Sequence, residues 1–278
     1  MLRSARVRQP RPIVALAVVL LVALAGAGCA STNRLREAQA AFNEAAAAES
    51  QLRFGDALAE GSTQGAVTQH TTIQNGYASA LLSLDQLDAR DVARLKQDRL
   101  WGNVLALRAL AQWKLGMLDR ARDTAKEAQQ VAADQIFPRD RALLLALPGL
   151  IKTDEAFAAL ERLPAEPTAA QRAATLRNVQ LLIADASDAI DRGRGAADAA
   201  HPVHLYLIQA RLAALRNLQV AHQRLGDGEA RTLPADRRDE AQALLKELRC
   251  RSERLELKTD PTGFWANKLT LTPAPGPC

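Results

Sequence analysis

The sequence predicts an all-α protein, either a TPR-like helical array or an irregular helical bundle, behind an N-terminal lipoprotein signal peptide. The amino-acid composition indicates the fold class. Alanine and leucine, both strong helix formers, make up 56 and 43 of the 278 residues. Aromatic residues contribute only 4% of the chain, and the residue types that favour strands are scarce. The composition argues against a β-sandwich or barrel, and against sugar or nucleic-acid stacking as the main activity.

Residues 1–28 have the layout of a bacterial secretory signal. Arg3 to Arg11 form a basic region, and Ile13 to Ala25 run without a charged or strongly polar side chain. Small residues follow, and Cys29 comes directly after them. A segment of this kind is removed from the mature protein, so it takes no part in the predicted fold.

The stretch from Leu24 to Cys29 resembles the lipobox of bacterial lipoproteins, although Gly26 stands where that family usually has leucine. The resemblance implies that Cys29 is lipidated, that residues 29–33 form a tether, and that the chain attaches to the membrane through its lipid anchor. Ala30, rather than aspartate, follows the cysteine, which favours the periplasmic face of the outer membrane. An uncleaved anchor and an ordinary cleaved signal are the alternatives, although residues 13–30 are short for a bilayer span of about 20 residues.

The positive charge of the chain lies largely in this signal. The net charge is +5, and removal of residues 1–28 takes away four of the 36 Lys and Arg residues and none of the 31 Asp and Glu residues, which leaves +1. A nearly neutral surface gives no electrostatic basis for binding nucleic acid.

Hydrophobic periodicity and helix stop signals predict an α-helical domain over residues 34–257 and a Pro-rich C-terminal tail over 258–278. Gly55 is a candidate break in the first helix. The expected helices are 34–60, 73–87, 91–115, 119–133, 139–147, 154–163, 168–192, 203–225 and 235–256. Residues 61–69 are expected to form a loop. We also expect Pro148 and Gly193 to end helices, and Leu269 and Leu271 to lie in a short extended segment.

Residues 102–135 resemble a tetratricopeptide repeat. Ala109, Gly116, Ala121 and Ala128 fall at the spacing which that repeat uses for close contacts between two antiparallel helices. Small residues let the helices approach, and Gly116 suits the turn. The resemblance implies a TPR-like array of helix pairs.

The resemblance weakens outside this unit and has departures within it. Arg108, Gln112 and Ala125 replace the leucine, aromatic and large residues of the family. The spacing of the family's second helix recurs in two further places, at Ala38, Phe42 and Ala45 and less closely at Ala241, Leu245 and Leu248.

The repeat resemblance also implies a partner-binding surface on the helix predicted at 91–115. Its residues are Asn103, Ala106, Leu110, Trp113 and Lys114. Trp113 is a natural binding anchor. The alternative is that Trp113 packs against a neighbouring helix.

Catalytic motifs are absent from the sequence, which has no Walker loop, G-x-G-x-x-G, G-x-S-x-G or H-E-x-x-H. His201 and His204 could share a metal ion, but a zinc site takes three or four ligands and no third is indicated. We therefore expect a capping or solvated pair, and His222 on a helix surface. The sequence predicts no catalytic residue, no metal site and no cofactor.

After acylation of Cys29, the two remaining thiols are Cys250 and Cys278. Export places them in an oxidising compartment, which predicts a disulfide between them. Phe264 and Trp265 are apolar enough to pack the returning tail on the body. The alternative is a buried Cys250 and a frayed C-terminus.

Together these features predict a non-enzymatic envelope lipoprotein that binds a protein partner in the periplasm, as a scaffold or assembly factor. One alternative is an envelope enzyme or small-ligand-binding protein that uses the region of His201 and His204. Another is a structural spacer with no specific partner.

Overall fold

The computed structural model describes residues 31–49, 63–226, 232–256 and 261–272. The regular secondary structure in these ranges is entirely helical, which confirms the predicted all-α class. A first helix covers residues 31–49. The elements that follow are α2 (Thr63–Asp85), α3 (Ala89–Gln97), α4 (Trp101–Lys114), α5 (Leu118–Val131), the 3-10 turn η1 (Ala133–Gln135), α6 (Pro138–Glu161), α7 (Ala169–Ala196), α8 (Pro202–Leu225), α9 (Ala235–Arg254) and α10 (Pro261–Leu269).

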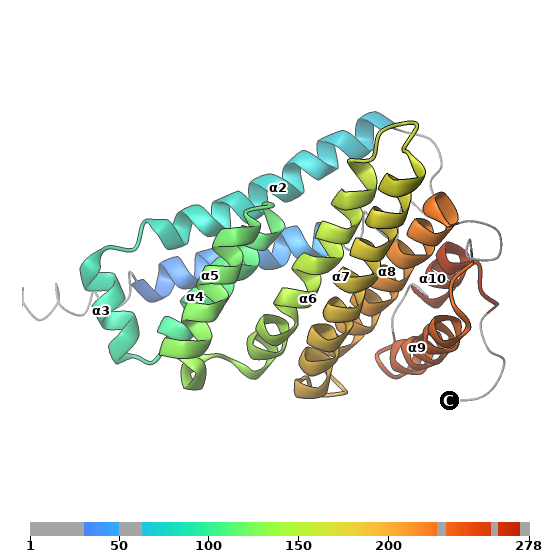
Figure 1. The fold of residues 1–278 in the computed structure, drawn as a ribbon. Helices are drawn as coiled ribbons and strands as arrows, with labels where there is room; N and C mark the ends of the chain where they lie inside the picture. Colours follow the sequence, from blue (N-terminus) through green and yellow to red (C-terminus); the bar gives the residue numbers. More distant parts are fainter. Residues whose placement is uncertain (1–30, 50–62, 227–231, 257–260, 273–278) are drawn as a thin grey trace, which may run out of the picture.

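Consecutive helices pack side by side, so the chain forms an array that runs from α3 at one end to α9 and α10 at the other (Figure 1). The most extensive contact between two helices is that of α6 with α7. Helix 31–49 and α2 lie together along the first half of the array, where α2 also packs on α4. A Cβ atom added to Gly76 of α2 would lie 2.8 Å from Cβ of Ala45, so glycine permits this close approach.

Helix α8 joins the apolar clusters along the array. Leu207 packs with the first part of the array, and Leu205 with α9 and α10. Leu218 packs with the far ends of α6 and α7. Because α8 is enclosed on several sides, its burial holds the two halves of the molecule together.

The segment predicted as one helix over 91–115 is divided into α3 and α4. Arg99 adopts a left-handed φ of 58°, and the N–H of Leu100 donates to the carbonyl of Leu95 over 2.8 Å. This hydrogen bond closes the C-terminal end of α3. The break buries both Leu95 and Trp101, and that burial offsets the cost of a left-handed non-glycine residue.

Pro148 does not end a helix, contrary to the sequence prediction, because α6 runs through it from Pro138 to Glu161. A proline inside a helix frees the carbonyl group four residues earlier. Here that carbonyl belongs to Leu144, and it accepts a hydrogen bond from Nε2 of Gln129 on α5 over 3.4 Å. The side chain of a neighbouring helix thus replaces the lost backbone donor.

Gly193 also lies inside a helix, since α7 continues to Ala196. A Cβ at Gly193 would come within 2.6 Å of the carbonyl oxygen of Ala142 on α6. Gly149 of α6 is in the same situation, with the carbonyl oxygen of Ala186 at 2.4 Å from an added Cβ. Both glycines therefore serve the close approach of α6 and α7.

We expect Gly193→Ala to destabilise the protein by about 1–3 kcal/mol, because the added methyl group overpacks the interface between α6 and α7. Gly195→Ala is the matched control. Its Cβ would meet nothing within 4 Å, so the higher helix propensity of alanine should stabilise by up to about 1 kcal/mol. Urea unfolding measures both changes, and changes of the same sign would contradict the close-approach interpretation.

The helix pair α4 and α5 shows the packing that the repeat resemblance implies. Ala109, Ala121 and Ala128 are each 0% exposed. Gly116 has a φ of 73°, and an added Cβ would meet nothing within 4 Å. Gly116 therefore serves the turn and not a close contact. Membership of the repeat family remains a prediction.

Both ends of the described body differ from the predicted boundaries. Residues 31–33 are already helical although the first helix was predicted to begin at 34, and α2 begins at Thr63, within the predicted loop 61–69. In the C-terminal tail, α10 replaces the expected extended segment around Leu269. Trp265 is 5% exposed and packs with α8 and α9, which confirms the predicted return of the tail.

Residues 1–28, Cys29 and Cys278 lie outside the described ranges, and so does Gly55. Within those ranges, no helix has the length and apolar character that a bilayer crossing requires.

Candidate functional site: a groove between four helices

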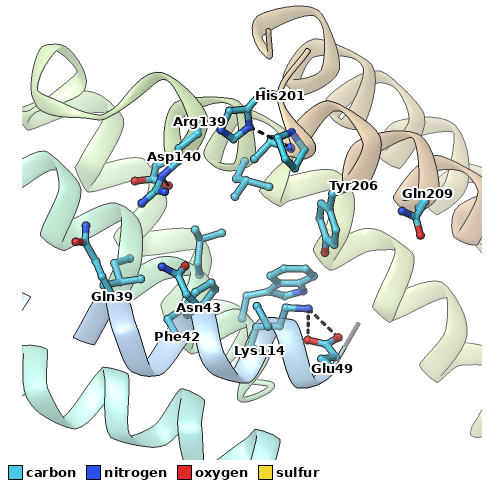
Figure 2. A pocket seen from close by; sticks show the side chains of 17 residues that line it. Gln39, Phe42, Asn43, Glu49, Lys114, Arg139, Asp140, His201, Tyr206 and Gln209 are labelled. Carbon is cyan, nitrogen blue, oxygen red and sulfur yellow. Dashed lines mark hydrogen bonds and ion pairs between the residues drawn. The ribbon is translucent and has the colours of Figure 1, made fainter. Parts of the chain in front are cut away.

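A cavity of about 360 Å³ lies where helix 31–49, α4, α6 and α8 meet. Its walls are mainly apolar and aromatic, and Figure 2 shows polar side chains around its edge. The main apolar side chains are Phe42, Leu107, Leu110, Leu143, Val203 and Tyr206. We call this cavity the groove.

Helical spacing explains how two of the helices contribute. Leu107, Leu110 and Lys114 are three and four residues apart on α4, so their side chains lie on one face. On α8, Tyr206 and Gln209 follow the same rule.

Lys114 and Glu49 form an ion pair at one end of the groove (Figure 2). Nζ of Lys114 lies 2.9 Å from Oε1 and 2.8 Å from Oε2 of Glu49. The same Nζ lies 4.4 Å from the ring centroid of Trp113 and 5.9 Å from that of Tyr206. Tyr77 donates its hydroxyl hydrogen to Glu49. The pair therefore ties helix 31–49 to α4, with cation–π contacts around the ammonium group.

Trp113 is fixed in place by a neighbouring helix. Its Nε1 donates to Oδ2 of Asp154 on α6 over 2.7 Å, and the residue is 9% exposed. Trp113 also lines a second cavity of about 210 Å³, which shares Lys114 and Glu49 with the groove. Trp113 thus packs against its neighbours and contributes to the groove surface as well.

Arg139, Asp140 and His201 gather at the opposite end of the groove, where α6 and α8 begin (Figure 2). Nε of Arg139 lies 3.3 Å from Oδ1 of Asp140. Nδ1 of His201 caps α8 by accepting from the N–H of Val203 over 3.1 Å. Burial raises the pKa of Asp140, while the nearby Arg139 and His201 oppose that rise.

The structure brings together three of the five residues predicted to bind a partner. Leu110, Trp113 and Lys114 border the groove, whereas Asn103 and Ala106 are 1% and 0% exposed and are not part of its lining. Oδ1 of Asn103 accepts from the N–H of Phe137 over 2.8 Å, so Asn103 positions the start of α6. Helices on both sides cover this part of α4.

His201 and His204, the two histidines of the alternative hypothesis, contact different parts of the protein. His201 caps α8 beside the groove, as the capping interpretation predicted. His204 is buried, and its Nε2 lies 2.9 Å from Oε1 of Glu247 on α9. Across the described ranges, no three His, Cys, Asp or Glu side chains are placed to hold a metal ion.

His222 is buried as well, 3.5 Å from Nε2 of Gln180 on α7. The prediction that it lies on a helix surface was wrong. Neighbouring helices enclose α8, so the face that carries His222 is covered.

Helix α8 also carries a buried arginine that no sequence pattern indicated. Arg211 of α8 is 2% exposed and pairs with Glu240 on α9. Oδ2 of Asp191 on α7 lies 3.8 Å from its Nε. Burial lowers the pKa of Arg211, and the charges of Glu240 and Asp191 oppose that change. This network joins three helices and has a structural role, since breaking a buried pair typically costs 3–5 kcal/mol.

The polar residues around the groove also escaped prediction. Arg139, Gln39, Asn43 and Gln209 come from three helices that are far apart in the sequence. Gln209 is 9% exposed, and its Oε1 accepts from Nε1 of Trp265 over 3.5 Å. Its amide nitrogen has no hydrogen-bond partner in the described part of the chain. No periodic signal marks such residues, because each is one polar position on an amphipathic helix.

Cys250 on α9 is disulfide-bonded. The chain has two other cysteines, Cys29 and Cys278, and both lie outside the described residues. The pairing of Cys250 with Cys278 therefore stays a prediction.

No protein-family model matches the chain, and no curated protein matches it closely enough to count as a relative. The function of the groove must therefore be inferred from its own residues.

Proposed function

We propose that this chain is a non-enzymatic envelope lipoprotein whose TPR-like helical array binds a protein partner, as a scaffold or assembly factor. It is anchored through Cys29 to the outer membrane and faces the periplasm. The groove is the observation that carries the proposal. In it Leu110, Trp113 and Lys114, the residues singled out by the repeat resemblance, meet apolar side chains from three other helices.

The groove has the features of a binding site for an apolar side chain of a partner. Asp154 holds the ring of Trp113 in one orientation before any partner arrives, which lowers the entropic cost of binding. Gln39, Asn43 and Arg139 supply a polar rim around the apolar centre. An aromatic centre with a polar rim is the usual arrangement at protein interfaces.

We assign no reaction step to the groove, because its charged side chains form ion pairs with each other. Lys114 pairs with Glu49, and Arg139 pairs with Asp140. A general acid or base needs a free proton-transfer group that converges on a substrate.

Photo-crosslinking in intact cells tests the scaffold function. A photoreactive residue at Asn43, on the exposed rim of the groove, is expected to capture a discrete envelope protein. The same residue at Ala174, exposed on α7 and not part of the groove lining, is the matched control and should not. Identical adducts at both positions, or none at Asn43, would contradict the proposal.

Small-ligand binding is the second candidate function, and the size of the groove favours it. Its volume of about 360 Å³ falls within the range of roughly 300–1,000 Å³ that is typical of small-molecule sites. His201 borders this groove and His204 does not, so only the first of the two predicted histidines belongs to the candidate site.

A further inference from the structure

We infer that the groove binds a small amphipathic carboxylate, with the apolar part of the ligand between the four helices and its carboxylate at the end where α6 and α8 begin. This inference rests on the second candidate function, small-ligand binding. It commits to one class of ligand and to one orientation of that ligand.

The middle of the groove suits an aliphatic or aromatic chain. Phe42, Leu107, Leu110 and Val203 line it from three helices, and Leu143 adds the fourth. Apolar walls of this kind gain by replacing contact with water by contact with another apolar group.

Arg139 provides a cationic group for the carboxylate. Its Nε faces Asp140, and its two terminal nitrogens have no partner in the described part of the chain. These two nitrogens form a planar fork that matches the two oxygens of a carboxylate.

The N-terminus of α6 reinforces the preference for an anion at this end. Phe137, the N-cap of α6, makes no side-chain capping hydrogen bond. The N–H groups of Arg139 and Asp140 are thus left without an acceptor among the described residues, beside the groove. The start of α8 lies at the same end, with His201 and Pro202 in the lining. Partial positive charge at helix N-termini stabilises anions.

The surroundings of the Asp140 carboxyl group show how a carboxylate is affected by the charges at this end of the groove. Burial raises its pKa, but Arg139 and His201 both favour its ionised form. The guanidinium of Arg139 would favour a ligand carboxylate in the same way. At the opposite end both oxygens of Glu49 contact Nζ of Lys114, whereas Asp140 contacts Arg139 at Nε and leaves its two terminal nitrogens open to a ligand.

Gln209 places a hydrogen-bond donor in the wall of the groove. Its side chain is nine-tenths buried, and its amide nitrogen has no partner in the described ranges although the residue lines the groove. This nitrogen is a donor that an acceptor inside the groove can use. Figure 2 shows Gln209 on the far side of Tyr206 from Arg139.

Calorimetric titration of the full-length protein in lipid nanodiscs tests the inference, with empty nanodiscs as the background. The probes are octanoate, octanol and octylammonium, which share an apolar chain and differ in the head group. We expect octanoate to bind at least about tenfold more tightly than the other two, because charge-assisted hydrogen bonds are the strong ones.

Arg139→Gln should lower octanoate affinity by about tenfold or more and leave octanol binding unchanged. Arg141→Gln, an exposed arginine on the same helix that is not part of the groove lining, should change neither. Asn43→Trp, introduced at the exposed rim, should weaken binding of both probes by filling the groove. Thermal unfolding of each variant verifies that it folds.

Two results would overturn the inference, and only the second would also reject small-ligand binding. If octanol binds as tightly as octanoate, or Arg139→Gln weakens both equally, the carboxylate assignment is wrong while small-ligand binding stands. If none of the probes binds, the small-ligand candidate fails too. The scaffold function is decided separately by the crosslinks at Asn43.

Discussion

Replacement of Cys29 by alanine is expected to leave an unprocessed precursor that takes up no acyl label. The lipobox resemblance assigns acylation to the thiol group of Cys29. Alanine has no nucleophilic group that could replace it. The expected effect is complete, since processing of a lipoprotein signal depends on that cysteine. Metabolic labelling with palmitate, together with the intact mass of the purified protein, measures both consequences.

A second cysteine variant controls for effects of removing any cysteine. Cys250→Ala removes a cysteine that is far from the signal in the sequence, so that protein should be labelled and processed as the wild type is, although its folded body should be less stable. A wild-type protein that keeps residues 1–28 would contradict the lipoprotein assignment. It would also remove the proposed outer-membrane location, which depends on the lipid anchor.

Loss of the disulfide at Cys250 is expected to have the largest effect on stability. If Cys250 pairs with Cys278, the bond closes a loop of 29 residues. In the chain-entropy model, closure of such a loop stabilises the folded protein by roughly 3.6 kcal/mol. Cys250→Ser should lower the free energy of unfolding by about this amount, as measured by urea unfolding without reductant.

The identity of the partner cysteine follows from comparing two variants. Cys278→Ser should destabilise as much as Cys250→Ser, and added reductant should then have no further effect on either. Two alkylatable thiols in unreduced periplasmic protein would show that the pairing is wrong. So would a Cys278→Ser variant as stable as the wild type.

The position of α10 makes this loop closure physically reasonable. Trp265 and Leu269 are 5% and 1% exposed, and both pack against the cluster formed by α8 and α9. The tail is therefore already folded back on the body before its last residues.

The sequence by itself determined the all-α class, the buried face of one helix and one turn. Tyr77, Leu81, Leu84 and Leu87 recur at steps of three and four residues, which indicates one helical face. The first three are buried, and Leu87 is partly buried against the core. Gly116 was predicted at a turn and has a positive φ. Such signals are local, because the period of a helix and the conformation of a turn depend on residues only a few positions apart.

Only the tertiary structure decided where some helices end. Pro148 remains inside α6 because Gln129, on another helix, bonds the carbonyl group that the proline frees. Gly193 reads as a stop signal in the sequence, but the carbonyl of Ala142 explains why glycine is needed within α7. In both cases the deciding contact comes from a residue beyond the reach of a local pattern.

The groove is decided by tertiary structure in the same way. Glu49 and Lys114 are 65 residues apart in the sequence, and their ion pair joins two helices at its edge. Phe42 and Val203 line it from helices that are still further apart. The sequence indicated Leu110, Trp113 and Lys114, but helix packing alone determines which polar residues face them. Packing between distant helices depends on the whole set of side chains that they bury, and no single segment contains that information.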